Sequence, residues 1–347
     1  MPPESGSLIG QVVGGQYKVR RLIGSGGMGD VYEADAKNGE KVALKVLHER
    51  AAQDPDLVAR FQREATIASQ VKSPYVARIL GAGKDRSGRL WIAFERLSGE
   101  PLDERLRREH YLAFSEVGPI VDDSLQGLEA AHKAGVIHRD IKPANLYIEK
   151  RKLTVREIQA GETEERTRIL DFGVSKIRSR GNKPKTEPSL TAFDATLGSF
   201  AYMAPEQVRG SARVDERADL YALGAVAFRA LSGRLPFEGT NALTLIALKL
   251  DREPPSLASV TGDEWPVVIE RFLERMMARD RERRFETASE ALTAWRKVLD
   301  AMGSGGAAGV PQPRPRSASI PDEDATAVTF ADTMTSSETD GGGRKGR

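Results

Sequence analysis

The stretch HRDIKPAN at residues 138–145, followed further along the chain by DFG at residues 171–173, decides how this sequence is interpreted. In this fixed order the two runs offer a proton acceptor, a cation and two oxygen ligands for a divalent metal. Together, such groups serve to move the terminal phosphoryl group of a nucleotide onto a hydroxyl. They are Asp140, Lys142, Asn145 and Asp171.

The size and charge of the chain limit what it can be. Its 347 residues exceed the ~250–300 at which a single hydrophobic core stops growing, so we expect two lobes and a tail. Lys and Arg number 52 against 50 Asp and Glu, with both signs interspersed, which gives no case for a nucleic-acid partner. The absence of cysteine excludes disulfides, thiolate chemistry and cysteine-bound zinc.

No stretch of the sequence has the character of a secretory signal or a membrane anchor. Residues 1–10 lack a basic stretch followed by an apolar one. The most apolar window, residues 220–231, is interrupted by Arg229 and falls short of the ~20 residues that a membrane span needs. We therefore expect a cytoplasmic protein without a membrane span.

Two kinds of periodicity divide the chain. Up to about residue 95, short runs typical of strands dominate, with one helical stretch at 56–70. Beyond about residue 102 the pattern is mostly helical, and Ser115 is a suitable N-cap for the first long helix, with Gly135 as its stop. The expected strands are 19–23, 30–34, 41–47, 76–80 and 90–94, and the expected helices are 115–134, 217–231, 241–250, 264–277 and 289–299.

These elements predict an α+β chain in several parts. A small β-rich lobe with one main helix covers residues 17–97, and a larger, mainly helical lobe covers residues 98–300. Residues 1–16 are expected to be an N-terminal extension. Residues 301–347 are rich in Gly, Pro, Ser and Thr and can bury little apolar surface, so we expect a disordered tail.

A glycine-rich turn lies in the β-rich part. Residues 24–31 read GSGGMGDV and fit G-x-G-x-x-G-x-V, a pattern in which backbone N–H groups can approach phosphate closely. Ordinary turns and dinucleotide-binding folds share this spacing. A dinucleotide fingerprint runs from a strand into a helix, whereas this turn runs from strand to strand, which favours a phosphate-binding loop.

Lys45 and Glu64 form a second candidate feature. Lys45 shares a strand face with Ala43 beneath the glycine turn, and Glu64 is a carboxylate on an otherwise apolar helical stripe. Each alone would be interpreted as a solvated surface residue. Because a buried lysine and a buried glutamate each need a partner, we expect them to pair and to hold Lys45 on the α and β phosphates.

Taken in order, these motifs resemble the eukaryotic-type protein kinase family over about residues 17–300. Lys142 and the stretch GSFAYMAPE at residues 198–206 are similar to its serine/threonine branch, and RFQRE at residues 60–64 is similar to its bacterial members. The resemblance implies a bilobal kinase fold. The motifs that carry it are the glycine turn, VALK at 42–45, Glu64, the runs at 138–145 and 171–173, and APE at 204–206.

The resemblance also implies roles for individual residues. Asp140 would orient the acceptor hydroxyl and take its proton. Asn145 and Asp171 would bind Mg²⁺, with Mn²⁺ as an alternative. The implied catalytic groups are Asp140, Lys142, Lys45 and Glu64. ATP would contact Ile23, Gly24, Ser25, Gly26, Gly27, Met28, Gly29, Val31, Ala43, Lys45, Phe94, Glu95 and Leu97.

Structural and regulatory roles follow from the same resemblance. Asp219 would bind the backbone of the catalytic loop, and Glu206 would pair with Arg284. Arg139, together with Lys176, would receive a phosphate from the segment that ends at APE, and autophosphorylation there would raise activity. The candidate phosphorylation sites are Ser189, Thr191 and Thr196, with Thr191 first.

Two functions from different classes remain open. One is an active serine/threonine protein kinase with ATP and protein substrates, and the other is a pseudokinase that serves as a nucleotide-binding scaffold. A scaffold could lose catalytic residues without a folding cost, yet none is missing, which favours the enzyme. The residues that decide between the two are Lys45, Glu64, Asp140, Asn145 and Asp171.

Three segments keep two interpretations. Residues 150–168 are longer and more charged than the family normally shows, and they form either an extended hairpin loop in water or a docking surface. Glu100 and Asp103 either attract basic peptides or begin a solvated helix. The tail is either simply solvated or, through Thr329 and its T-x-x-D spacing, bound by a phosphothreonine-binding forkhead-associated partner.

Overall fold

The structure is a computed structural model that describes residues 8–26, 29–48, 58, 61, 65–66, 68–155, 159, 164–171, 197–210, 214–239, 241–303 and 311. The chain divides into two units, residues 1–314 and 315–347, and all described residues lie in the first. Several predicted site residues lie outside the described residues: Gly27, Met28, Glu64, Lys176, Ser189, Thr191 and Thr196.

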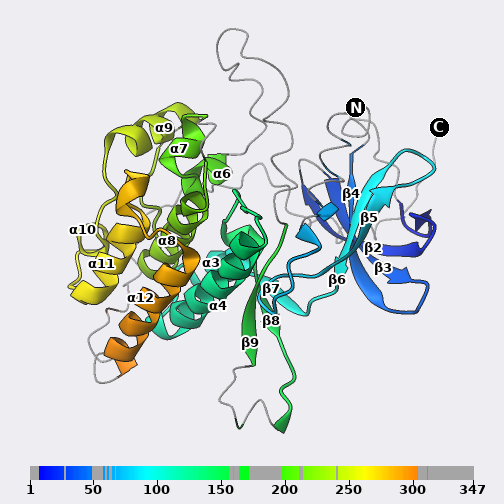
Figure 1. The fold of residues 1–347 in the computed structure, drawn as a ribbon, viewed down its shortest axis with the longest axis horizontal. Helices are drawn as coiled ribbons and strands as arrows, with labels where there is room; N and C mark the ends of the chain where they lie inside the picture. Colours follow the sequence, from blue (N-terminus) through cyan, green and yellow to red (C-terminus); the bar gives the residue numbers. More distant parts are fainter. Residues whose placement is uncertain are drawn as a thin grey trace, which may run out of the picture. The chain divides into compact units, whose positions relative to one another are not determined.

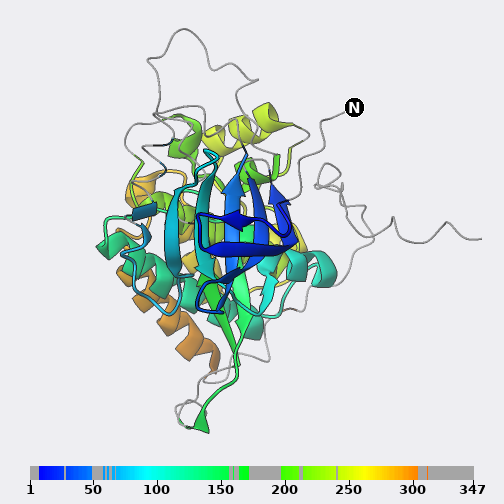
Figure 2. The same ribbon diagram turned by 90° about the vertical axis from the view of Figure 1, so that its right-hand side faces the viewer.

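A six-stranded antiparallel sheet forms the N-terminal lobe, with strand order β1-β2-β3-β4-β6-β5 (Figures 1 and 2). At the described positions 58, 61, 65, 66 and 68 the chain is helical, as expected for residues 56–70. The strands are β1 Val12–Val13, β2 Tyr17–Gly26, β3 Gly29–Ala36, β4 Lys41–Leu47, β5 Ile79–Lys84 and β6 Leu90–Glu95.

Alternation along β4 explains why this sheet forms and where it directs its side chains. Val42, Leu44 and Val46 are buried in a core that includes Trp91, whereas Ala43 and Lys45 are half-buried on the opposite face. A strand that buries every second residue has the period of two expected for a sheet with one core face. The expected placement of Ala43 and Lys45 on one face is therefore confirmed.

The sheet begins earlier than expected, because Val12 and Val13 pair with Lys18 and Tyr17 inside the expected extension. Val13 is completely buried. The chain reverses through Gly14, whose φ is +60° and where a Cβ would meet the Trp91 ring at 2.6 Å. A two-residue strand carries too little periodicity to be seen in the sequence.

The strand expected at residues 76–80 is also displaced, since β5 begins at Ile79. Val76 instead makes an isolated parallel bridge with Ile169. The backbone N–H of Arg78 donates to the side-chain carboxylate of Glu95 at 2.7 Å, while the Glu95 N–H donates to Arg78 O at 3.0 Å. Just before β5, the Glu95 side chain thus takes the place of the backbone oxygen that would continue the sheet.

The C-terminal lobe is mainly helical, and α8 runs through its core with nearly every residue buried (Figure 1). The apolar window at residues 220–231 is therefore a core helix, as its all-round hydrophobicity permits. The helices are α3 Leu102–Glu109, α4 Phe114–Lys133, α6 Leu197–Tyr202, α7 Pro205–Val208, α8 Arg217–Ser232, α9 Ala242–Asp251, α10 Leu257–Thr261, α11 Val267–Met276 and α12 Ala288–Ala301, with 3₁₀ turns at Pro143–Asn145 and Arg281–Arg283.

The start of α4 differs from the expectation. The N-cap is Ala113, not Ser115, and the Glu116 carboxylate accepts a hydrogen bond from the Ala113 N–H at 3.0 Å. A carboxylate in the first turn thus satisfies the helix start and complements the helix dipole. The helix ends at Lys133, and Gly135 follows with a φ of +74°, as expected of a glycine stop.

A small sheet follows residues 95–97, which connect the two lobes and are called the hinge below. Its strands are β7 Gly99–Pro101, β8 Leu146–Lys150 and β9 Glu165–Ile169. Strands β8 and β9 form the base of the extended hairpin expected for residues 150–168. Arg168 on β9 is 8% exposed and donates to Val76 O at 2.9 Å and to Glu149 at 2.8 Å. It also bonds the Glu95 carboxylate, so it joins the hinge to β9 and to the segment before β5.

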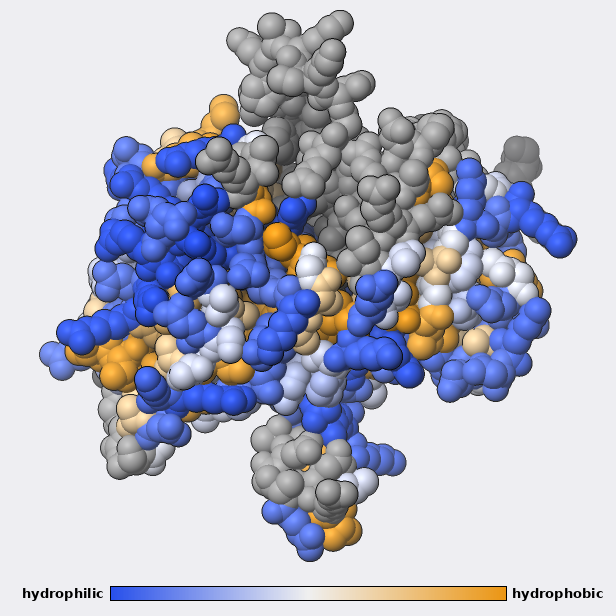
Figure 3. Space-filling model, viewed as in Figure 1, coloured by the Kyte–Doolittle hydropathy of each residue, from blue (hydrophilic) through white to orange (hydrophobic). Residues whose placement is uncertain are grey.

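The bilobal α+β fold is confirmed by this arrangement. On the face shown in Figure 3, polar side chains cover much of the surface, with smaller apolar areas between them. None of the helices in the described part of the chain is long and apolar enough to cross a membrane.

Candidate active site

The HRDIKPAN stretch forms a compact loop that brings three of the predicted groups together. Lys142 Nζ lies 3.1 Å from Asp140 Oδ2. Asn145 Nδ2 donates to the Asp140 backbone oxygen at 2.7 Å and approaches its Oδ2 at 3.2 Å. Because its amide nitrogen is used in this way, the Asn145 amide oxygen is left as a ligand for a cation.

Asp219, which is fully buried on α8, holds the loop from behind. Its carboxylate accepts hydrogen bonds from the N–H groups of His138 at 2.8 Å and Arg139 at 2.6 Å. His132 Nε2 lies 2.9 Å from the same carboxylate. Burial raises the pKa of Asp219, but His132 and His138 outweigh it and place the pKa below its usual value. The carboxylate is therefore ionised at neutral pH.

Two residues of the site have left-handed backbone conformations. The φ of Arg139 is +62° and that of Asp171 is +55°, values that side chains other than glycine rarely adopt. On the N-terminal side of Arg139, Asp219 accepts hydrogen bonds from the N–H of Arg139 itself and from that of His138 before it. The Arg139 backbone oxygen accepts from Gln207 Nε2 at 2.8 Å, so the strained residue is held at both ends.

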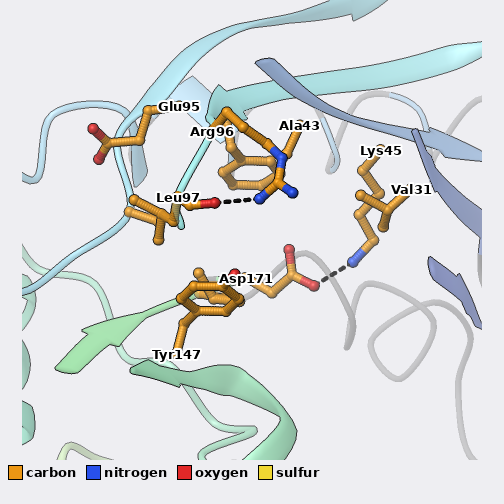
Figure 4. Close-up of a pocket in the computed structure, with 11 residues that line it drawn as sticks. Val31, Ala43, Lys45, Glu95, Arg96, Leu97, Tyr147 and Asp171 are labelled. Atoms are coloured by element: carbon orange, nitrogen blue, oxygen red, sulfur yellow. Dashed lines mark hydrogen bonds and ion pairs between the residues drawn. The ribbon is translucent and has the colours of Figure 1, made fainter. Parts of the chain in front are cut away.

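Asp171 and Lys45 form an ion pair with 2.5 Å between Oδ2 and Nζ (Figure 4). Burial raises the pKa of Asp171, but the charges of Lys45, His138 and Lys142 overcome this effect and lower it. The Asp171 carboxylate is therefore ionised at neutral pH. The expected Lys45–Glu64 pair lies outside the described residues, and the partner that the structure gives Lys45 is Asp171.

The residues present fit a divalent cation that is shared with a phosphate ligand. Asp171 offers a carboxylate and Asn145 an amide oxygen, which are the ligand types that Mg²⁺ takes up alongside water and phosphate oxygens. No cluster of three or more His, Asp or Glu side chains that could hold a metal occurs among the described residues. A site that depends on substrate phosphates needs no such cluster.

A pocket opens beside this ion pair (Figure 4). It contains six residues that the sequence named as nucleotide contacts, together with Ala77, Arg96, Tyr147 and Leu170, which it did not. The six are Val31, Ala43, Lys45, Phe94, Glu95 and Leu97.

Tyr147 and Arg96 are the main additions to the pocket. The Tyr147 hydroxyl donates to Gly99 O at 2.7 Å, which fixes its ring along the wall of the pocket. An aromatic ring in this position offers a stacking surface for a planar base. Arg96 folds toward the pocket and bonds the Leu97 backbone oxygen. Alternation could have found Tyr147, because its neighbour Leu146 is fully buried on the other face of β8.

Phe94 belongs both to the interior of the N-terminal lobe and to the wall of the pocket. It pairs with Ala43 across the sheet and packs with Phe61, Leu90 and Ile92 in an apolar cluster, and it also lines the pocket. It therefore separates the pocket from the interior of the lobe.

The glycine turn connects β2 and β3 as a strand-to-strand turn. Within its described part, Ile23, Gly24, Ser25 and Gly26 belong to β2, and the Ser25 hydroxyl donates to Asp30 at 2.6 Å. A Cβ at Gly29 would come within 2.8 Å of the Leu47 α-carbon, so only glycine fits there. None of these residues lines the described pocket.

The segment that contains APE is anchored in the helical lobe. Arg284 donates to both carboxylate oxygens of Glu206, at 2.7 and 2.9 Å, and its own side chain is fully buried. Gln207, which the sequence did not single out, accepts from the Ala204 N–H at 3.0 Å. Its amide nitrogen is the group that bonds Arg139 O, so Gln207 links this segment to the catalytic loop.

The acidic residues after the hinge are already engaged by neighbouring arginines. Glu100 bonds Arg105 at 2.9 Å and Arg108 through both carboxylate oxygens. The hydrogen bonds from Arg108, followed by those from Arg105, lower the pKa of Glu100 to about 2. Asp103 pairs with Arg107. These contacts favour the solvated helix start over the attraction of basic peptides.

Comparison with known proteins gives consistent matches. Residues 17–295 match the family described as the protein kinase domain. Serine/threonine-protein kinase pkn3 of Myxococcus xanthus is 35% identical over 339 residues, which cover 94% of this chain and 60% of that protein. PknA of Mycobacterium tuberculosis is 34% identical over 252 residues, which cover 71% and 53%.

A solved structure supports the same fold. The PknI kinase domain of Mycobacterium tuberculosis matches with a TM-score of 0.62 and 27% identity, over 84% of this chain and 99% of that one. The curated relatives are longer than this chain, which spans 60% of pkn3 and 35% of pkn2, both from Myxococcus xanthus.

Proposed function

Because the chain belongs to the protein kinase family, we propose that it is a serine/threonine protein kinase that transfers the γ-phosphoryl group of ATP to protein hydroxyls. The observation that carries this proposal is the meeting of Asp140, Lys142 and Asn145 in one loop, with the Lys45–Asp171 pair at the edge of the pocket. Phosphoryl transfer depends mainly on such positioning and on neutralising charge.

The residues divide the work by their chemistry. ATP with a divalent cation, Mg²⁺ or alternatively Mn²⁺, supplies the phosphoryl donor when bound. Asn145 and Asp171 would hold the cation, and Lys45 would contact the phosphates in place of its present bond to Asp171. Asp140 would orient the acceptor hydroxyl and take its proton, while Lys142, 3.1 Å away, would neutralise charge on the transferred group.

The wider assignment rests on the same family relation. A kinase domain over residues 17–300 would use protein substrates in the cytoplasm, where ATP is available, and autophosphorylation at Thr191, Thr196 or Ser189 would be read by Arg139 and Lys176. The tail at residues 301–347 would carry the candidate forkhead-associated motif at Thr329. Mass spectrometry after incubation with ATP and Mg²⁺ tests both regions, and unmodified peptides would end these two ideas.

One experiment separates the active enzyme from a nucleotide-binding scaffold. Wild type, Asp140→Asn and the matched surface control Asp300→Asn are incubated with labelled ATP, Mg²⁺ and a library of Ser- and Thr-containing peptides. We expect Asp140→Asn to reduce transfer by about 10²–10⁴-fold, as for loss of a general base, and Asp300→Asn to leave it unchanged. Equal labelling by wild type and Asp140→Asn would contradict the catalytic assignment and favour the scaffold.

A further inference from the structure

Lys249 on α9 is a charged side chain that neither the sequence patterns nor the catalytic roles above explain. It is 1% exposed, which places it among the most completely buried large side chains of the described chain. Lysine is almost never fully buried unless it is paired. Within the described part of the chain, however, no carboxylate forms an ion pair with Lys249.

The partners of Lys249 are backbone oxygens of the segment that precedes APE. Its ammonium donates to Ala201 O at 2.6 Å and to Met203 O at 3.0 Å. The ring centroids of Tyr221 and Phe237 lie 5.1 and 5.8 Å from Nζ, within the range of cation–π contacts. Among the described residues, the cation is therefore held by carbonyl dipoles and aromatic faces.

The need for this cation follows from where α6 ends. The last carbonyl groups of a helix have no partner inside the helix, and α6 ends at Tyr202 in an apolar cluster that excludes water. Phe200 and Ala201 are 4% and 3% exposed. Lys249 supplies donors to these carbonyls, and a positive charge at the C-terminal end of a helix is also favoured by the helix dipole.

The same segment is joined to the catalytic loop on its other side. One residue after Met203, the Ala204 N–H donates to Gln207 at 3.0 Å, and Gln207 donates to Arg139 O at 2.8 Å. Arg139 directly precedes Asp140. A chain of hydrogen bonds thus leads from the Lys249 ammonium, through the backbone of residues 201–204 and the Gln207 side chain, to the residue beside the proposed proton acceptor.

We propose that Lys249 is a positioning residue for the protein substrate: it fixes the backbone of residues 201–203 and so sets where an extended Ser- or Thr-containing peptide lies relative to Asp140. This role rests on the proposed kinase function and deepens it. Burial, assisted by Arg284, lowers the pKa of Lys249 to about 7, so the ammonium is held at a cost that an ordinary packing residue would not require.

The test uses the full chain and separates the KM for peptide from the KM for ATP. A peptide is first chosen on the wild type from the Ser/Thr library, with Asp140→Asn as the blank. Lys249→Met removes charge and donors but retains length, Lys249→Gln retains one donor group, and Lys297→Met is the matched control on an exposed face of α12. Thermal unfolding with and without ATP reports whether each variant is folded.

We expect Lys249→Met to raise the KM for peptide about tenfold, the effect of losing two hydrogen bonds, with the KM for ATP within about twofold of wild type. Lys249→Gln should lie between, and Lys297→Met should match wild type. A folded Lys249→Met with unchanged peptide KM would overturn the proposal, as would an equal loss for both substrates. Failure of both Lys249 variants to fold would overturn it too, because the lysine would then serve folding. Absence of transfer by wild type would instead refute the kinase function.

Discussion

Asp219 on α8 and Lys249 on α9 are both buried charges in the helical lobe, and they organise the backbone in opposite ways. Asp219 accepts hydrogen bonds from the N–H groups of His138 and Arg139 behind the catalytic loop. Lys249 donates hydrogen bonds to the carbonyls of Ala201 and Met203 beneath the APE segment. One region is thus held by an anion and the other by a cation.

The difference between them is the presence of a hydrogen-bonded partner side chain. Asp219 has His132 at 2.9 Å, and the histidines around it keep its pKa below the usual value despite burial. Burial and Arg284 lower the pKa of Lys249 to about 7, with no carboxylate bonded to it among the described residues. The charge that holds the catalytic loop is therefore present throughout the neutral pH range, whereas the charge on Lys249 is lost as the pH rises above about 7.

Removing the charge of Asp219 should have the largest effect. Asp219→Asn would direct an amide NH₂ toward a site that already receives N–H groups from His132, His138 and Arg139. We expect a loss of about 3–5 kcal/mol in the free energy of unfolding and a fall in kcat of about 100-fold or more. Urea unfolding and steady-state kinetics measure both. A kcat within fivefold of wild type would show that the loop keeps its geometry without this carboxylate.

Next in size is the buried pair beneath the APE segment. Arg284→Met leaves the Glu206 carboxylate without its two hydrogen bonds at 2.7 and 2.9 Å, which should cost about 3–5 kcal/mol in the free energy of unfolding. The double variant Glu206→Gln with Arg284→Met removes both charges and should regain part of the loss. Equal stability of the single variant and wild type, by urea unfolding, would contradict this expectation.

A smaller effect is expected from the titration of Lys249, which should make the free energy of unfolding depend on pH. Between pH 7 and the usual lysine value of 10.5, the unfolded chain binds a proton at Lys249 that the folded chain does not, so stability should rise with pH. The cost of the buried charge is complete below pH 7. Tyr221, whose ring faces Lys249, stays neutral in this window, because burial raises its pKa.

The comparison of wild type with Lys249→Met isolates the contribution of Lys249 to the pH dependence of stability, since all other groups titrate in both proteins. From pH 7 to pH 9, the stability of wild type relative to the variant should rise by about 1–2 kcal/mol in urea unfolding. A constant difference over this range would mean that Lys249 titrates normally in the folded protein.

The smallest effect is expected where both charges are exposed. Arg234 and Glu238 form a pair at 2.9 Å whose side chains are 58% and 50% exposed. Glu238→Gln should change the free energy of unfolding by about 0.5 kcal/mol or less, because water screens such pairs. A loss above 1 kcal/mol here would undermine the contrast between buried and exposed charges.

The sequence predicted best where chemistry is concentrated in short runs. Asp140, Lys142 and Asn145 lie within one loop, so their proximity follows from spacing alone. The bilobal fold and most helices followed from periodicity. The two-residue strand β1 was not predicted, because two residues carry no measurable period.

What the sequence could not predict are contacts between distant elements. Gln207 and Arg168 act through backbone atoms that periodicity does not describe. Lys249 left one signal: it lies four residues after the buried Leu245 on α9, on the apolar side of the helix. A lysine on the apolar side of a helix indicates a buried acceptor elsewhere in the chain. The acceptor can be identified only from the fold, because Ala201 and Met203 are far from Lys249 in sequence.

The bonds of Arg168 have a consequence for motion of the pocket. Because this one side chain is fastened to the hinge at Glu95, to Val76 O and to Glu149, the edge of the pocket nearest the hinge acts as a fixed pivot. Rotation of the six-stranded sheet about that pivot would displace the glycine turn most and the hinge least. We therefore expect nucleotide to enter and leave beside the turn, with the base wall at Tyr147 and Leu97 remaining in place throughout.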